Sequence, residues 1–296
     1  MNKATAQRAR LKALGRQAHL VLAHGRPEVV VTMPGSVEDD VLCTAVCHAL
    51  RERGYRVIWV MTHHPEIFQS SPDVDGAVPR NEDSEAAARR CGARFLTLDP
   101  RATCEAGEHV IASLCRQAEL TGTVTLRPMI YLRPDDLVGA GPPDRSIAVC
   151  IASSQEDAGA VDAITATAGL LQQGYEIVQV GDAGDPPVPG AKDLRGQLSP
   201  RQAAAVLARC GAMLGTVSWW AHLARAVECP SVLVRATGDC SPRSVYPCNV
   251  EVSLLDPTAS DPVTLAAIVR RVAARPRQPL ETASVDLSPG AMSVAA

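Results

Sequence analysis

The chain has 296 residues with a formal net charge of −3, and 46% of the residues are hydrophobic and 21% charged. This length suits two domains of about 100–150 residues each, and the composition is typical of a globular protein. The balanced charge gives no reason to expect nucleic acid as a partner, and no apolar run approaches the roughly 20 residues of a membrane-spanning helix.

Residues 1–27 predict a basic N-terminal helix, since they contain six lysines or arginines and no acidic residue. Such a helix can be a solvated surface element, which is the usual role of a charge run. The alternative is an arm that contacts anionic lipid or an acidic acceptor. We expect a cytoplasmic protein, with this helix as the candidate contact to the inner face of the membrane, because ten cysteines without C-x-x-C pairs indicate free thiols.

The first half of the chain alternates between strand and helix patterns. Val29–Thr32 is a β-branched run that predicts a buried strand, and Pro34 to Ser36 forms the following turn. The later elements predicted in this half are a helix at 39–53, a strand at 56–61, a short helix from 65, a helix at 84–91, a strand at 94–98 and a helix at 102–120. We assign residues 28–135 to one domain.

The stretch from 136 to 145 is rich in Pro and Gly, and we expect a linker there. The alternation then restarts over 146–275, the second predicted domain. Its predicted strands are 146–152, 175–180, 212–216 and 231–235, and its predicted helices are 157–173, 200–209, 219–227 and 261–274. Residues 276–296 are predicted to form a flexible tail.

Two such alternating runs predict an α/β protein with two Rossmann-like domains facing across a cleft, each a parallel sheet with flanking helices. Ligands of such sheets bind beyond the carboxyl ends of the strands. Two loops at these strand ends carry candidate site residues. Ser218 lies where a loop becomes a helix and His222 lies one turn further on, which is the pattern of an anion site. In the first half, Asp39 offers a carboxylate at the matching place, so the pair suggests group transfer from a phosphorylated donor.

Each of these residues also has a plain structural interpretation. Asp39 can be a first-turn helix acid, His222 an interior histidine, and Ser218 an N-cap whether or not it binds phosphate. Trp219 and Trp220 can stack on a base or sugar, or fill the space between the domains.

Three further groups were considered as site residues. Ser154 with Asp157 is typical of a capping box, and Gly181 follows a strand in a weak nucleotide-loop pattern. Cys43 and Cys47 share a helix face with apolar residues, so we expect buried thiols and no metal site.

The segments PGSVEDDVLCTAVCHALRERGYRVIWV, HPEIFQSSPDVDGAV, GYEIVQVG and DLRGQLSPRQAAAVLARCGAMLGTVSWWAHLARAVECPSVLV resemble, in this order, the ADP-heptose lipopolysaccharide heptosyltransferases of glycosyltransferase family nine. The resemblance covers roughly residues 28 to 255. It implies the GT-B fold and an inverting sugar transfer without a catalytic metal. The implied co-substrate is a nucleotide-sugar such as ADP-heptose, and no cofactor is implied. The implied acceptor is a saccharide, a lipid-linked or a small-molecule hydroxyl.

Carried over by position, the resemblance assigns the general base to Asp39, with Asp40 as the alternative if the following helix sets the alignment. Glu38 stands where the family has a glycine.

In the second half, the donor motif falls on Ser218 and His222, with Trp219 in place of a glycine. Ser153 and Ser154 stand where the family usually has a cation, and Gly181 belongs to the neighbouring loop.

These departures leave three functions open. The first is a sugar-nucleotide transferase. The second is a non-catalytic relative that binds a sugar, a nucleotide or a protein partner. The third is another enzyme with the same cleft, such as an epimerase or a hydrolase.

Overall fold

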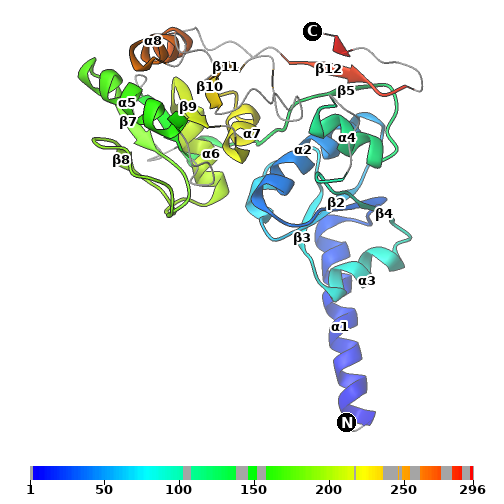
Figure 1. Ribbon diagram of the computed structural model, residues 1–296. Helices are drawn as coiled ribbons and strands as arrows, with labels where there is room; N and C mark the ends of the chain where they lie inside the picture. The colour runs from blue at the N-terminus through cyan, green and yellow to red at the C-terminus, as the bar shows by residue number, and fades with distance from the viewer. Residues whose placement is uncertain are drawn as a thin grey trace.

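The chain folds into two α/β lobes that are joined side by side, with a long helix projecting from the N-terminal lobe (Figure 1). The computed structural model describes residues 3–102, 108–137, 146–151, 158–216, 218–235, 246, 249–253, 261–274, 282–288 and 294–295. Both lobes contain parallel sheets flanked by helices, as the alternating pattern predicts.

The N-terminal lobe is built on a four-stranded parallel sheet in the order β3-β2-β1-β4. Its strands are β1 (Val29–Thr32), β2 (Ile58–Thr62), β3 (Gly76–Pro79) and β4 (Arg94–Thr97). The valines of β1 are completely buried, because a central parallel strand is covered on both faces. β3 is absent from the sequence prediction, since Gly and Pro are disfavoured in strands, and it lies at the sheet edge where Pro is tolerated.

The helices of this lobe are α1 (Lys3–His24), α2 (Val37–Glu52), α3 (Glu82–Arg90) and α4 (Val110–Gln117), with the 3₁₀ turns η1 (Pro65–Phe68) and η2 (Pro134–Leu137). Three of them, α2, α3 and α4, begin at residues whose side chains cap the helix. α4 is shorter than the predicted helix at 102–120, because His109 caps its N-terminus by accepting a hydrogen bond from the N–H of Ile111.

The C-terminal lobe is built on a six-stranded parallel sheet in the order β11-β10-β9-β6-β7-β8. Its strands are β6 (Ser146–Cys150), β7 (Glu176–Gln179), β8 (Lys192–Asp193), β9 (Ala212–Thr216), β10 (Ser231–Arg235) and β11 (Val250–Ser253). Its helices are α5 (Ala158–Gln172), α6 (Pro200–Arg209), α7 (Trp219–Ala226) and α8 (Pro262–Ala273). α5 and α8 contact one another, while α6 and α7 lie on the side of the N-terminal lobe (Figure 1).

A third, antiparallel sheet corrects the prediction of a flexible tail over 276–296. It consists of β5 (Thr123–Thr125), β12 (Ser284–Asp286) and β13 (Val294–Ala295), with β12 between the other two. The pairing is extended by hydrogen bonds from the N–H of Leu126 to Ala283 and from the N–H of Leu287 to Gly122. The strands were missed because two or three residues are too few to show the alternation that marks a strand in a sequence.

The two lobes share one hydrophobic cluster. It includes buried residues of α2 and α4 from the first lobe and of α6 and α7 from the second. α2 contacts α7 directly. The predicted linker at 136–145 lies largely outside the described residues, which resume at Ser146.

A buried arginine of α6 adds polar bonds to this contact. Arg201 donates to both carboxylate oxygens of Asp136 at 3.1 and 2.6 Å, and to the carbonyl oxygens of Glu66, Gln69 and Tyr131. The three carbonyl acceptors belong to the first lobe and Asp136 begins the predicted linker, so Arg201 fastens the second lobe to the first.

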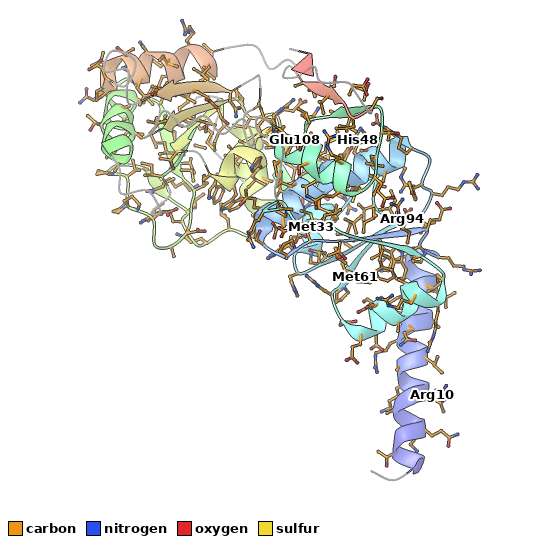
Figure 2. All side chains as sticks on the ribbon, turned by 45° about the vertical axis from the view of Figure 1, so that its right-hand side comes forward. Arg10, Met33, His48, Met61, Arg94 and Glu108 are labelled. Carbon is orange, nitrogen blue, oxygen red and sulfur yellow. The ribbon has the colours of Figure 1, made fainter. Side chains whose placement is uncertain are left out.

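The basic N-terminal helix is present as α1. It rests on α3 near its C-terminal end, where Arg16 pairs with Asp83 at 2.5 Å. Its N-terminal half extends away from the protein, and Arg10 projects from it (Figure 2). None of the described helices is both long and apolar enough to span a bilayer.

Candidate functional site

The first turn of α2 carries three consecutive acids whose side chains take different directions. Asp39 is 2% exposed and completes a capping box with Ser36. Its Oδ2 accepts hydrogen bonds from the N–H groups of Gly35 and Ser36 at 2.9 and 2.8 Å, and its own N–H donates to Ser36 Oγ. Asp39 therefore has a structural role, while its Oδ1 makes no hydrogen bond within the described chain.

Asp40 points back into the N-terminal lobe. Its Oδ2 accepts a hydrogen bond from Thr62 Oγ1 of β2 at 2.6 Å. Burial above all, with the charges of Asp39 and Glu66, raises the pKa of Asp40 to about 7, although the hydrogen bond from Thr62 lowers it. Asp40 is thus a carboxyl group that can hold a proton near neutral pH.

Glu38 points toward the other lobe. Its Oε1 lies 3.6 Å from His222 Nε2 on α7, and its side chain is 47% exposed. Burial and then the charge of Asp39 raise the pKa of Glu38, while Arg101 lowers it. Residue 38 lies within a regular helix and is not among the positive-φ residues. The loss of a glycine here therefore causes no backbone strain, and Gly35 supplies the positive φ of the preceding turn at +113°.

α7 begins where β9 ends, at the carboxyl edge of the second sheet. Ser218 is its N-cap residue, as predicted, but its hydroxyl does not cap the helix. It donates to the carbonyl of Thr216 at 3.4 Å. Within the described part of the chain, the first N–H groups of α7 thus receive no cap from the Ser218 side chain, and a helix end in this state attracts anions.

His222 is buried one turn inside α7, at 2% exposure. Its Nδ1 is 2.6 Å from the hydroxyl of Tyr246, and its Nε2 faces Glu38. Burial lowers the pKa of His222 to about 4, so the ring is neutral at physiological pH and its contact with Glu38 is not an ion pair. The structure brings His222 and the first turn of α2 together across the lobe boundary.

His109, at the N-terminus of α4, is a third polar group in this region. Its ring centroid lies 5.1 Å from that of Tyr246. Burial and then the charge of His222 lower the pKa of His109 to about 3. Since its Nδ1 accepts from the N–H of Ile111, the neutral ring carries its proton on Nε2, and this buried donor has no hydrogen-bond partner among the described residues.

The two tryptophans pack against one another at the start of α7. Their ring centroids are 4.3 Å apart, with an angle of 32° between the planes. Trp220 is buried within the hydrophobic cluster shared by the two lobes, and the partly buried Trp219 packs against that cluster. Filling space between the lobes is therefore one role of the pair.

Gly181 occupies a tight turn after β7. Its φ is +148°, and a Cβ on it would collide with Asp185 Oδ2. Asp185 Oδ2 also accepts a hydrogen bond from the N–H of Asp182 at 2.8 Å. Ser153 and Ser154, the predicted contacts after β6, lie outside the described residues.

The expectation of buried thiols is confirmed for Cys43 and Cys47. Both are completely buried, with their sulfur atoms 3.9 Å apart. The nearby His48 is hydrogen-bonded to Asp73. Within the described ranges, no group of three or more His, Cys, Asp or Glu side chains is arranged to hold a metal ion.

The sequence does not predict the roles of His109 and Tyr246, and it marks Glu38 only as a departure from the family that the chain resembles. The run of three acids at the start of a helix was a usable signal, because such residues face different directions and one can reach a neighbouring domain. His109 and Tyr246 gave no comparable signal, since only the tertiary fold brings them to His222.

No protein-family profile and no curated protein sequence matches the chain. Several solved structures are similar to this chain. ADP-heptose lipopolysaccharide heptosyltransferase II of E. coli is similar with a TM-score of 0.63 and 13% identity, over 83% of this chain and 98% of the other.

Two further structures give the same picture. A family 9 glycosyltransferase of Veillonella parvula has a TM-score of 0.57 and 14% identity, over 77% of this chain and 86% of the other. E. coli heptosyltransferase WaaC, solved with ADP, has a TM-score of 0.51 and 14% identity, over 82% of this chain and 98% of the other. The chain therefore has the two-lobed GT-B fold of these glycosyltransferases, as the sequence resemblance implied.

Proposed function

We propose that the protein is a glycosyltransferase that moves a heptose or related sugar from a nucleotide-sugar to an acceptor hydroxyl, with inversion and without a metal or bound cofactor. The observation that carries this proposal is the uncapped N-terminus of α7 with His222 beneath it, facing the acidic first turn of α2. An anion site on one lobe and carboxylates on the other match the two needs of the reaction.

The donor diphosphate is proposed to bind at the start of α7. The N–H groups at this helix end, the helix dipole and the neutral imidazole of His222 would stabilise the charge that develops on the leaving group. Ser218 and Trp219 lie at this helix end. Gly181 follows β7 and Ser153 and Ser154 follow β6 in the chain, and in the parallel sheet β6 lies between β9 and β7. All these loops therefore belong to one edge, and ADP-heptose is the proposed donor because WaaC was solved with ADP.

The proposed base is Asp39. Its Oδ1 would take the proton of the acceptor hydroxyl while the hydroxyl oxygen bonds to the anomeric carbon. The bond from that carbon to the diphosphate breaks in the same step, and the nucleoside diphosphate leaves with the electron pair. Asp40 supports this role less well, despite its raised pKa, because its Oδ2 is held by Thr62 inside the lobe.

The proposed acceptor is a saccharide, a lipid-linked or a small-molecule hydroxyl, reached from the cytoplasm. Exposed basic residues of α1 and the exposed side chains of Leu11 and Leu22 support contact with an anionic membrane surface. This would place the enzyme at the inner face of the membrane.

Calorimetric titration with ADP, GDP and UDP, followed by the matching nucleotide-sugars, tests the proposal. We expect one nucleotide to bind, His222→Ala to weaken it at least tenfold, and Asp39→Ala to abolish transfer while donor binding remains. Each variant is first checked for folding by circular dichroism, because Asp39 also completes a helix cap.

The second candidate is a non-catalytic relative that keeps the fold and binds a sugar, a nucleotide or a protein. The observation in its favour is the hydrophobic cluster that Trp220 extends across the lobe boundary. If none of the three nucleotides or their sugars binds at millimolar concentration, the transferase proposal fails and this candidate replaces it.

A further inference from the structure

Glu38 is the one acid of the α2 first turn that reaches the opposite lobe. Its Oε1 is 3.6 Å from His222 Nε2, whereas Asp39 is turned to its own loop and Asp40 to β2. Within the described residues, no hydrogen bond holds the Glu38 carboxylate in place. It is therefore a half-exposed side chain that can change rotamer without a change in the backbone.

The atom that Glu38 faces is the one that a ligand would use. His222 Nδ1 is already engaged by the Tyr246 hydroxyl at 2.6 Å, so Nε2 is the ring nitrogen left for a further partner. Because the His222 ring is neutral at physiological pH, it cannot offset the negative charge of the carboxylate. The first three residues of α7, two tryptophans and an alanine, carry no charge either.

A carboxylate in this place competes with a phosphate oxygen. Both are anionic acceptors, and each would receive the hydrogen bond of the same Nε2–H group. Two negative charges a few ångströms apart repel each other appreciably even near a protein surface. The raised pKa of Glu38 reflects the same surroundings, where burial and the charge of Asp39 both disfavour its ionised form.

We propose that Glu38 sets the affinity of the donor site by occupying the place beside His222 that a donor phosphate oxygen takes, so that the carboxylate must swing away before the diphosphate binds. This inference rests on the proposed function, since it assumes that the diphosphate binds at α7. Glu38 thereby selects by ligand charge. It weakens the binding of a nucleoside diphosphate and has no effect on the uncharged nucleoside.

The experiment is calorimetric titration of four proteins with ADP, GDP and UDP and with the corresponding nucleosides. The proteins are the wild type, Glu38→Gln, His222→Ala and the control Glu52→Gln, which changes an acid of similar exposure (45%) at the far end of the same helix. Thermal unfolding of each protein verifies that it is folded.

We expect Glu38→Gln to bind the preferred nucleoside diphosphate about tenfold more tightly than the wild type, which corresponds to about 1.4 kcal/mol. The affinity for the nucleoside should stay the same, and Glu52→Gln should behave as the wild type for both ligands.

The results separate this inference from the function on which it rests. If a diphosphate binds the wild type and His222→Ala weakens it, but Glu38→Gln binds no more tightly, the role of Glu38 is wrong and the donor site stands. If Glu38→Gln binds the nucleoside and the nucleoside diphosphate more tightly by the same factor, the wild-type side chain acts by its size and not by its charge. The inference then fails as well. If no diphosphate binds any of the four proteins, both proposals fail together.

Discussion

At the scale of single residues, the three acids at positions 38 to 40 show how one helical turn separates chemical roles. Glu38 faces the other lobe, Asp39 closes the helix cap, and Asp40 is buried against β2. Successive residues of a helix point about 100° apart. Three neighbouring carboxylates therefore lie in three different environments. The sequence predicts a cluster of acids here, but only the packing of α7 and β2 decides which of them is free.

Asp40→Asn should make the protein more stable than the wild type, by an amount that grows as the pH rises. The folded-state pKa of about 7 lies above the unfolded value of about 3.9, so wild-type stability is lost as the pH rises from about 4 through 7. The asparagine cannot ionise and can still accept the bond from Thr62. Denaturant unfolding should show little difference between variant and wild type at pH 4, and a variant more stable by about 2–4 kcal/mol at pH 8. Glu82→Gln, an exposed acid, is the control, and an equal gain at both pH values would contradict the assignment.

Gly181→Ala should destabilise the turn after β7 by about 1–3 kcal/mol, because of the positive φ and the collision with Asp185. Gly174→Ala is the matched control, since that glycine also has a positive φ of +78° but no atom within 4 Å of a Cβ. Thermal unfolding should rank Gly181→Ala below Gly174→Ala. Equal melting temperatures would show that the collision is relieved by a shift of Asp185.

At the scale of elements, the sequence predicted most of the two large sheets, because their inner strands are short apolar runs and their helices have clear ends. Val29–Thr32, Ala212–Thr216 and Ser231–Arg235 were predicted at the observed bounds. The edge strand β3 and the three-residue strands β5 and β12 were missed, since hydrogen bonding to a distant partner forms them and local composition does not. For the same reason Ser218 and His222 could be placed at a helix start, but the contact of His222 with Glu38 could not.

The element that differs most from its prediction is β12, and Leu287 tests it. Leu287 is 4% exposed beside β5, so Leu287→Ala should lower the free energy of unfolding by about 2–4 kcal/mol. Val263→Ala is the control, because Val263 is 77% exposed on α8. If chemical denaturation gives the same small change for both variants, the segment is not packed in solution.

At the scale of the whole molecule, the lobes are joined by both apolar and polar contacts. The hydrophobic cluster runs through α2, α4, α6 and α7 without a break at the lobe boundary. Arg201 adds a fork of bonds to Asp136 and three carbonyl groups. Any movement of one lobe against the other must therefore break or shift these contacts.

Arg201→Lys should test how far the lobes depend on this fork. A lysine keeps the charge but lacks the planar guanidinium group that bonds all these acceptors at once. The carbonyl groups left without a hydrogen bond should lower the free energy of unfolding by about 2–4 kcal/mol. Calorimetry should show a single unfolding transition in the wild type and a lower melting temperature in the variant. Arg89→Lys, at an exposed pair with Glu85, should leave the temperature unchanged. Two separate transitions in the wild type would contradict the shared cluster.

The pairing of β5 with β12 also sets an order of events during biosynthesis. About 160 residues separate Thr125 from its partner Ser284, and a ribosome needs roughly 8–32 s to add them. Throughout that interval the nascent N-terminal lobe displays an unpaired strand edge, which is a template for the wrong chain. The N-terminal lobe is thus completed only after a segment about 160 residues further along the chain has emerged, and until then the edge of β5 can pair with another strand.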